Sequence, residues 1–370
     1  MKRFTKGSIN VLLAACLSAS VVGCSSGTNS STTSSNTTTN TNFNSQSSTD
    51  SSSKTATTTG IKERLIKFGS GANEDHPVGQ AMKKFKEIVE EKSGGKIKVN
   101  TYFSNTLGDD QKLMESLIGG TAEMATPTTS PIVGTVKEFG VFDFPFVLND
   151  EAEADKVLAS PLGQKILDKL PEKGLVGLDY WEWGFRVLTN SKHEVSKVED
   201  FNGLKIRTQQ NPVHLDVFKA LGANPTPMPF SEVFTALESH TVDGQENPIQ
   251  AIESGKFHEV QTHMTLTNHV YSPIVILISK KFWDQLNDEE KEIIQDAVVE
   301  SGEFEKKLLR EQNEKSLENI KSTGIQISEF SMEEKAKVQE MIKPILDNYA
   351  KEFGEELVNE FYQEVEKARK

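Results

Sequence analysis

Residues 65–120, LIKFGSGANEDHPVGQAMKKFKEIVEEKSGGKIKVNTYFSNTLGDDQKLMESLIGG, alternate between strand and helix patterns. The short apolar run at 65–68 is typical of a buried strand, and alternating apolar residues at 97–102 predict a second strand. Apolar residues recur at helical spacing over 82–89 and again over 113–118. Glycines separate these segments, as chain turns require. The order strand–helix–strand–helix predicts an α/β fold with a parallel sheet.

The alternation of strands and helices continues along the chain. A helix over 152–170 and a strand over 175–180 are expected to complete the first α/β unit. A second unit begins near Arg186. Its expected elements are a strand at 204–207, helices at 214–221 and 231–237, and a returning strand at 271–279.

A long amphipathic helix is expected from Asn287 onward, because acidic residues fill its first turn and an apolar stripe continues to Ile320. At 1.5 Å per residue such a helix approaches ~50 Å. Gly302 interrupts the stripe and sustained heptads are absent, which favours a strut across two domains over a coiled-coil dimer. The segment 332–370 predicts further helix.

The length, net charge and cysteine content of the chain exclude several classes of function. The 370 residues are enough for two domains. A net charge of -13 argues against binding to nucleic acid or adsorption to anionic lipid. Cys16 and Cys24 are the two cysteines, so the chain beyond them offers no disulfide, thiolate metal site or cysteine nucleophile.

The N-terminus has the pattern of a secretory signal, with basic residues, an apolar run and small residues ahead of a cysteine. It resembles a bacterial lipobox, so residues 1–23 are expected to be a signal peptide and Cys24 the lipidated residue. Cys16 also fits, but it would leave a very short apolar region. An uncleaved membrane helix is the alternative, although the apolar run is shorter than the ~20 residues that span a bilayer. The Ser/Thr/Asn-rich segment 24–60 is expected to be a disordered tether.

Enzyme signatures are largely missing. There is no G-x-S-x-G elbow and no phosphate-binding P-loop. His258-Glu259 with His263 is a near miss for a zinc helix, because the second histidine stands at i+5 instead of i+4. Acidic pairs such as Asp109-Asp110 are expected to be helix caps or solvated turns. We therefore expect no cofactor and no metal.

Several polar residues stand where ligands collect in α/β proteins, at the carboxyl ends of strands. Arg207 ends the strand at 204–207, and Arg186 follows a strand inside the aromatic segment WEWGFR, 181–186. Segment 242–248 reads as a turn in which Asn247 is extended because proline follows it. A guanidinium offers a planar fork that matches a carboxylate. The alternative for either arginine is a structural salt bridge, at a strand end for Arg207 and near the hinge for Arg186.

Two further candidates, Asn73 and His76, lie on the loop after the first strand, where either could reach a cleft or simply cap a helix.

Taken together, these segments resemble a known receptor family. The densest stretch is GLKIRTQQNPVHLDVFKALGANPTPMPFSEVFTALESHTVDGQENP at 203–248, followed by KFHEVQ at 256–261. Upstream, SGGKIKV, LGDD, FGVFDFPF and YWEWGFR fit as well. From about residue 61 to its end the chain resembles the DctP-like solute-binding proteins of tripartite ATP-independent periplasmic (TRAP) transporters.

The resemblance implies a periplasmic-binding-protein-like, Venus flytrap fold of two α/β domains with hinge strands and a long domain-spanning helix. Domain I would comprise 61–185 and a return segment at about 273–312. Domain II would comprise 186–272 and C-terminal helices at about 313–370. The family's main carboxylate-binding arginine falls on Arg207, with Arg186 as a second arginine and Asn247 orienting the ligand. Phe230 and Trp183 would form walls of the pocket.

The expected function is a receptor on the outer face of the cytoplasmic membrane. It would bind a C4-dicarboxylate or a sugar acid such as a uronate or gulonate, close around it, and deliver it to an ion-gradient-driven TRAP permease. Sialic acid is disfavoured, because the resemblance places the acidic residue of sialic-acid receptors at the position where Thr128 or Thr129 stands here. The alternatives are a ligand-sensing receptor for a membrane histidine kinase and a secreted hydrolase or lyase.

Overall fold

The N-terminal part of the described chain forms a first sheet, in the region where the sequence predicts alternating strands and helices. The computed structural model describes residues 60–370, so the predicted signal peptide, Cys24 and all of the tether except Gly60 lie outside the described residues. Strand β1 (Arg64–Gly69) pairs in parallel with β2 (Ile97–Tyr102) and β3 (Met124–Ala125). Helices α1 (Pro77–Lys92) and α2 (Asp110–Gly119) connect them. The predicted strand–helix–strand–helix unit is confirmed.

Strand β4 (Leu175–Asn190) carries the chain from this sheet into a second one. Its first part pairs with the returning strand β9 (Tyr271–Ser279), which also pairs with β3. From Arg186 on, β4 pairs with β7 (Gly244–Pro248). The strand predicted at 175–180 is therefore much longer, and Arg186 lies inside a strand instead of after one.

In the second sheet, shorter strands pair with the C-terminal part of β4 and with one another. Strand β5 (Lys205–Thr208) lies parallel to β6 (Asn224–Pro227) and to β7. The turn predicted at 242–248 is wrong, because most of that segment is the buried strand β7. The remaining strands of this sheet are β8 (His263–Leu266) and β10 (Gln326–Glu329). Helices α6 (Pro212–Ala220), α7 (Val233–Glu238) and α8 (Ile249–Ser254) lie between its strands in the sequence.

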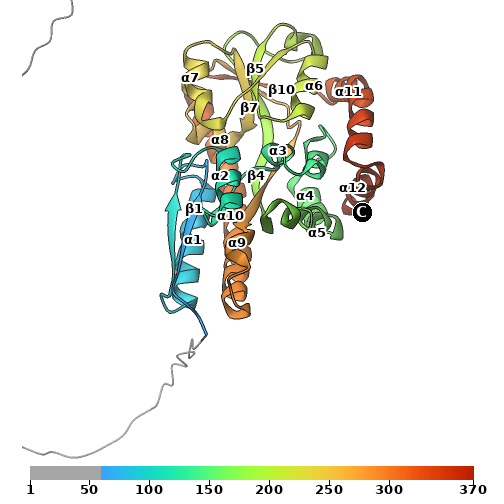
Figure 1. Cartoon of the computed structure of the whole chain (residues 1–370). Coiled ribbons are helices and arrows are strands. Elements are labelled where there is room, and N and C mark those ends of the chain that lie inside the picture. Colours follow the sequence, from blue (N-terminus) through green and yellow to red (C-terminus); the bar gives the residue numbers. More distant parts are fainter. Residues whose placement is uncertain (1–59) are drawn as a thin grey trace, which may run out of the picture. The chain divides into compact units, whose positions relative to one another are not determined.

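We call β1–β3, β9 and the first part of β4 with their helices the first lobe, and the sheet of β5–β8 and β10 with its helices the second lobe. In Figure 1 β4 runs between the two.

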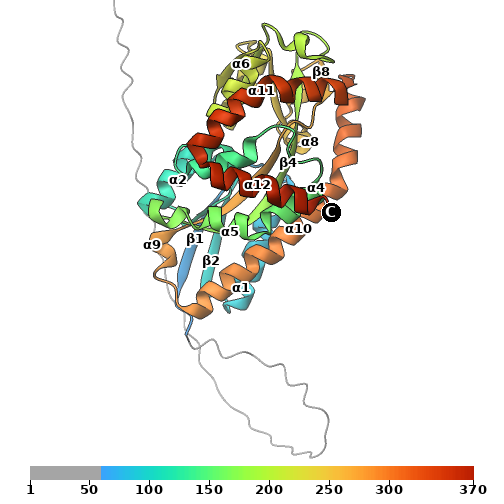
Figure 2. The same ribbon diagram turned by 90° about the vertical axis from the view of Figure 1, so that its right-hand side faces the viewer.

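Helix α10 (Asp288–Ser322) has 35 residues and begins at a capping box between Asn287 and Glu290. It packs against α1 and β4 of the first lobe and against α8 of the second, and Figure 2 shows its length along the molecule. The predicted strut is confirmed. Gly302 does not interrupt it. This glycine instead lets the helix approach Trp181, whose indole Nε1 donates to the Val298 carbonyl at 3.1 Å.

Replacing Gly302 by alanine is expected to destabilise the protein by about 1–3 kcal/mol, because a core that is already filled resists added carbon. An added Cβ would lie 2.6 Å from Trp181 Nε1. Replacing glycine by alanine inside a helix normally stabilises a protein by about 1 kcal/mol. A decrease in the free energy of unfolding would therefore show that the added methyl group is crowded. Gly119→Ala in α2 is the matched control, since no atom lies within 4 Å of its added Cβ. Urea denaturation of both variants measures the effect, and a Gly302→Ala protein as stable as its parent would contradict it.

One long helix of the sequence prediction is broken, and the further helix predicted at the C-terminus is confirmed as two helices. The helix expected over 152–170 is two helices, α4 (Glu151–Leu158) and α5 (Pro161–Leu167), because Ser160 caps a new helix that begins with proline. The C-terminal segment divides into α11 (Met332–Phe353) and α12 (Glu355–Ala368) at Gly354, whose φ is +110°.

The two C-terminal helices serve different lobes. Helix α11 packs on α6, whereas α12 packs on α4 and α5 (Figure 2). The described residues, 60–370, belong to one compact unit, and the proposed domain boundaries within it stay a prediction. Between residues 60 and 370, none of the helices has the length and apolar character that crossing a membrane requires.

Candidate functional site

Two small cavities lie side by side where the lobes meet. They share Asp110, Gln209 and Phe230, and each measures about 30 Å³. The first cavity is lined by Ser70, Gly71, Ala72, Asp110, Thr126, Thr128, Trp183, Gln209, Phe230 and Asn247. The second is lined by Asn105, Asp109, Asp110, Pro131, Arg207, Gln209, Gln210, Met228, Pro229 and Phe230. We call this set the cleft site. It takes residues from the ends of β1 and β3 in the first lobe and from β5 and β7 in the second.

Arg207 is the cation of the cleft site. It is 2% exposed, and its Nε and Nη2 both donate to the Met228 carbonyl, at 3.1 and 2.6 Å. Its Nη1 is buried without a hydrogen-bond partner, and no carboxylate of the described residues forms a salt bridge with it. Burial lowers the pKa of Arg207 to about 9, which leaves it charged at neutral pH. A buried cation with a free N–H is a site for an anion.

Arg186 is fully paired inside the protein. Its Nε and Nη2 donate to both carboxylate oxygens of Glu246, and both side chains are completely buried. Its Nη1 donates to Ser272 Oγ at 3.2 Å. Burial alone would raise the pKa of Glu246, but the charge of Arg186 and a hydrogen bond from His269 hold that pKa well below its usual range. A direct role of Arg186 in ligand binding stays a prediction; here it is the partner of Glu246.

Asn247 links this ion pair to the cleft site. Its Oδ1 accepts from Arg186 Nη2 at 3.2 Å and from Trp183 Nε1 at 3.5 Å, and its Nδ2 donates to Gln245 at 2.6 Å. The extended conformation expected before proline is confirmed, because Asn247 lies in β7. Asn247 therefore faces the first cavity with its amide already fixed by three neighbours.

Three rings form a stack beside the cavities. His76 lies on Trp183 with ring centroids 4.6 Å apart, and Trp183 meets Phe230 edge-on at 6.0 Å. Trp183 and Phe230 line the first cavity, as the resemblance implied. His76 caps α1 by accepting from the Val78 N–H through Nδ1, and burial lowers its pKa to about 3. It is a neutral ring that supports Trp183.

Asn73 lines neither cavity and connects the lobes. Its Nδ2 donates to the Ser254 carbonyl of α8 at 2.7 Å, and its Oδ1 accepts from Ser104 at 2.8 Å. A second bridge crosses the cleft itself, where Gln209 Nε2 donates to Thr128 Oγ1 at 2.8 Å. Of the two predicted loop residues, one thus bridges the lobes and the other packs behind the aromatic wall.

Sequence reasoning missed Asp110. Asp109 caps α2, as expected, by accepting from the Lys112 N–H at 3.0 Å. Asp110 instead lines both cavities and accepts from Thr128 Oγ1 at 3.5 Å. Burial raises the pKa of Asp110 to about 7; the nearby charge of Asp109 adds to this shift, and hydrogen bonds from Thr128 oppose it. Asp109 and Asp110 cannot be told apart by residue type. The fold shows that Asp109 caps the helix and that Asp110 lines the cleft site.

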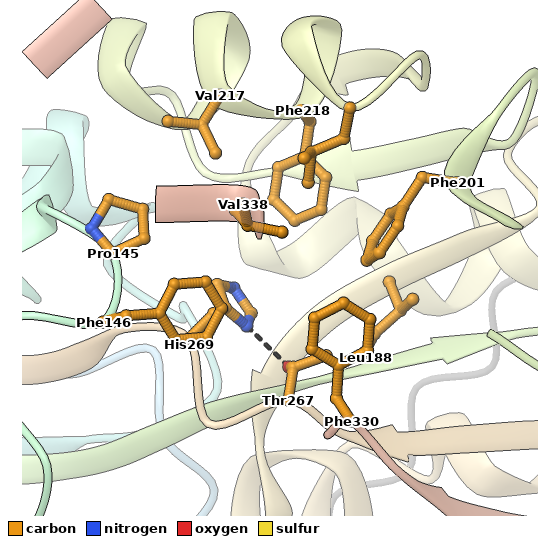
Figure 3. A pocket seen from close by; sticks show the side chains of 11 residues that line it. Pro145, Phe146, Leu188, Phe201, Val217, Phe218, Thr267, His269, Phe330 and Val338 are labelled. Atoms are coloured by element: carbon orange, nitrogen blue, oxygen red, sulfur yellow. Dashed lines mark hydrogen bonds between the residues drawn. The ribbon is translucent and has the colours of Figure 1, made fainter. Parts of the chain in front are cut away.

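A separate apolar cavity of about 20 Å³ lies in the second lobe beneath α6 and α11. Figure 3 shows its walls, mostly aromatic and aliphatic side chains, with the contact of 2.7 Å between Thr267 and His269 Nδ1 as its polar feature. Neither Arg186 nor Arg207 lines this cavity. His269, which does line it, contacts Glu246 through its Nε2 at 3.2 Å. We read it as core packing.

The arrangement suits binding more than chemistry. No group of three or more His, Cys, Asp or Glu among residues 60–370 could hold a metal ion. The cleft site offers one unpaired cation, an aromatic wall and several fixed polar groups, which is the composition of a small-molecule pocket.

Comparison with known proteins agrees with this geometry. The family described as bacterial extracellular solute-binding protein, family 7 (DctP), matches residues 68–352. The chain belongs to this family. Its members bind solutes outside the cytoplasm, and their fold is the two-lobed Venus flytrap described above.

Relatives of this family 7 protein include the 2,3-diketo-L-gulonate-binding periplasmic protein of Escherichia coli, 35% identical over 73% of this chain and 83% of the relative. The C4-dicarboxylate-binding periplasmic protein of Rhodobacter capsulatus is 34% identical over 80% of this chain and 89% of its own length. The sugar acid binding protein of Advenella mimigardefordensis, solved in complex with galactonate, is 49% identical, with a TM-score of 0.82. That match covers 83% of this chain and 99% of the solved one.

Proposed function

We propose that this protein binds a small organic acid, a sugar acid or a C4-dicarboxylate, between its two lobes and delivers it to an ion-gradient-driven TRAP permease. The observation that carries the proposal is the buried Arg207, whose Nη1 has no partner within the protein. The solutes named for its relatives, diketogulonate, C4-dicarboxylates and galactonate, all carry carboxylates and support the same assignment. The protein acts as a carrier and not as an enzyme.

Ligand charge would favour the closed arrangement of the lobes. An unpaired buried cation costs free energy, and a bound carboxylate removes that cost through a bidentate, charge-assisted contact. The lobes approach each other through the bonds Gln209–Thr128 and Asn73–Ser254, so the anion and these bridges act in the same direction. The strands β4 and β9 and the helix α10 connect the lobes and provide the hinge.

Delivery requires the receptor to stay near the membrane. We propose that residues 1–23 are removed as a signal peptide, that Cys24 carries the lipid and that residues 25–60 form the tether. The receptor then works on the outer face of the cytoplasmic membrane, next to its permease.

A thermal-shift screen tests the proposed function directly. The screen would include C4-dicarboxylates, hexuronates, gulonate, galactonate and keto acids, with neutral sugars as controls. An acid at 100 times its dissociation constant is expected to add ~2.7 kcal/mol to the unfolding free energy, because it binds only the folded state. Affinity near 1 µM corresponds to about -8 kcal/mol. If no carboxylate raises the melting temperature more than its neutral counterpart does, the proposal is wrong.

A further inference from the structure

Two segments that resemble the receptor family, FGVFDFPF at 139–146 and QNPVHL at 210–215, meet outside the cleft site. Asp143 ends the 3-10 helix η1 (Lys137–Asp143), and Asn211 caps α6. Each of these two side chains is 1% exposed. Neither lines the two cavities, so a ligand in the cleft site would leave both untouched.

Asp143 belongs to the first lobe and Asn211 to the second. Helix η1 and the preceding α3 (Thr129–Ile132) both pack on β9 of the first lobe. Asn211 lies between β5 and α6 of the second lobe. From its place on β9, η1 also reaches α6, so the contact between Asp143 and Asn211 joins the lobes.

The contact consists of direct hydrogen bonds from Asn211. Its Nδ2 donates to Asp143 Oδ2 at 2.8 Å and to the Ser130 carbonyl at 3.2 Å. Its Oδ1 meanwhile accepts from the Val213 N–H at 2.8 Å and so caps α6. The other oxygen of Asp143 accepts from Ser130 Oγ within the first lobe, and His214 Nε2 of the second lobe lies 3.1 Å from it. Both ends of the Asn211 amide are therefore in use.

The burial of Asp143 depends on these partners. Separation of the lobes would remove Asn211 and leave the carboxyl group with Ser130 and water. Burying a carboxyl group costs free energy unless hydrogen-bond donors replace the water that it loses. Asn211 supplies such a donor when the lobes are together. A residue at position 211 that cannot donate would raise the free energy of the closed arrangement and leave the open one unchanged.

We propose that Asp143 and Asn211 form a latch that holds the two lobes together around the ligand without touching the ligand. This inference rests on the proposed function. The apparent affinity of a receptor falls with the fraction of molecules that can adopt the binding arrangement. Loss of the latch therefore weakens the binding of every ligand by the same factor, whereas a change inside the cleft site affects different ligands unequally.

Asn211→Asp tests the latch, because it places a second carboxyl group beside Asp143 and keeps an oxygen that can cap α6. The probes are galactonate, succinate and any other acid that the thermal-shift screen identifies. Binding of each acid that binds the parent is expected to weaken by the same factor, on the order of 100-fold, because like charges at this distance oppose closure. Calorimetric titration measures the affinities.

Exchanging the two residues is the rescue. The double variant Asp143→Asn with Asn211→Asp again has one donor and one acceptor at the contact, and it should bind within about tenfold of the parent. Asn348→Asp is the matched control, because Asn348 is exposed on α11 and the substitution adds the same charge away from the contact. That variant should bind as the parent does.

Urea denaturation without ligand separates a latch from a permanent structural bond. A bond that forms on closure contributes little to the ligand-free protein, so Asn211→Asp should unfold at the parent's urea concentration. If the ligand-free variant is less stable and the double exchange restores its stability, the bond belongs to the resting fold and the latch is overturned. Asn211→Ser also caps α6, withdraws the amide donor and adds no charge, so it repeats the test should Asn211→Asp not fold. Its binding should weaken by about tenfold.

The outcomes for the latch and for the proposed function differ. Unchanged affinity in the folded Asn211 variants, or losses that differ between ligands, would overturn the latch and leave the receptor function standing. If no acid of the screen binds the parent, the proposed function fails and the latch fails with it.

Discussion

Replacing Arg207 by alanine is expected to lower affinity for the acid ligand by several hundred-fold, which corresponds to about 3–5 kcal/mol for one partner of a buried charge pair. The ligand carboxylate would then enter a buried cleft in which no described cation lies free to receive it. Calorimetric titration with the acid identified by the thermal-shift screen measures the loss.

The same substitution is expected to leave the ligand-free protein as stable as its parent, or more so. Without a ligand, Arg207 is a buried cation whose described partner is the Met228 carbonyl, and removing such a charge relieves a desolvation cost. Urea denaturation of the ligand-free variant measures this. A structural salt bridge would behave in the opposite way.

Two control variants define what the arginine contributes. Arg207→Lys keeps the charge but loses the planar fork, so it should bind at intermediate strength. Lys205→Ala removes an exposed charge from the same strand β5 and should bind as the parent does. An Arg207→Ala protein with unchanged affinity for every acid that binds the parent would refute the assignment of Arg207.

Replacing Glu246 by alanine is expected to destabilise the fold by about 3–5 kcal/mol, because it leaves the fully buried Arg186 without its counter-charge. Both carboxylate oxygens are occupied, by Arg186 and by His269, so two buried side chains lose a partner at once. The fall in the free energy of unfolding can be measured by urea denaturation of the ligand-free protein.

The controls for Glu246 test whether the pair, and not the acid alone, matters. Asp347→Asn breaks an exposed pair with Lys343 and should change stability little. Replacing Arg186 and Glu246 together by methionine should recover much of the lost stability, since a well-packed apolar pair can substitute for a buried ion pair. A Glu246→Ala protein that unfolds at the parent's urea concentration would show that Arg186 finds another partner.

Much of the fold could be predicted from local patterns. The elements β1, α1, β2, α2, β5, α6 and β9 formed where periodicity placed them, because their apolar spacing fits one kind of element only. The errors occurred where tertiary pairing overrides local signals. The polar residues at 244–248 predicted a turn. They form a buried strand in the middle of the sheet instead, because β4 and β5 pair with it on either side. Ser160 and Pro161 restart a helix that apolar spacing alone had continued.

The candidate site was predicted in part for a similar reason. Arg207, Trp183, Phe230 and Asn247 were named from the sequence, and all four line the two cavities. Asn73 and His76 do not line them, and Asp110, which does, was expected to be a helix cap or part of a solvated turn. The identity of an acidic residue at the start of a helix does not show whether its side chain will cap the helix or face a cleft.

The sequence by itself determined the order and type of most elements, the long helix that connects the lobes, and which side chains could bind an acid. Only the tertiary structure decided which of two similar arginines remains free. Arg186 meets Glu246, 60 residues away, and is neutralised, whereas Arg207 meets a carbonyl and keeps a bare N–H. The physical reason is that the free energy of a buried charge depends on partners a few ångströms away, and the fold alone brings those partners together.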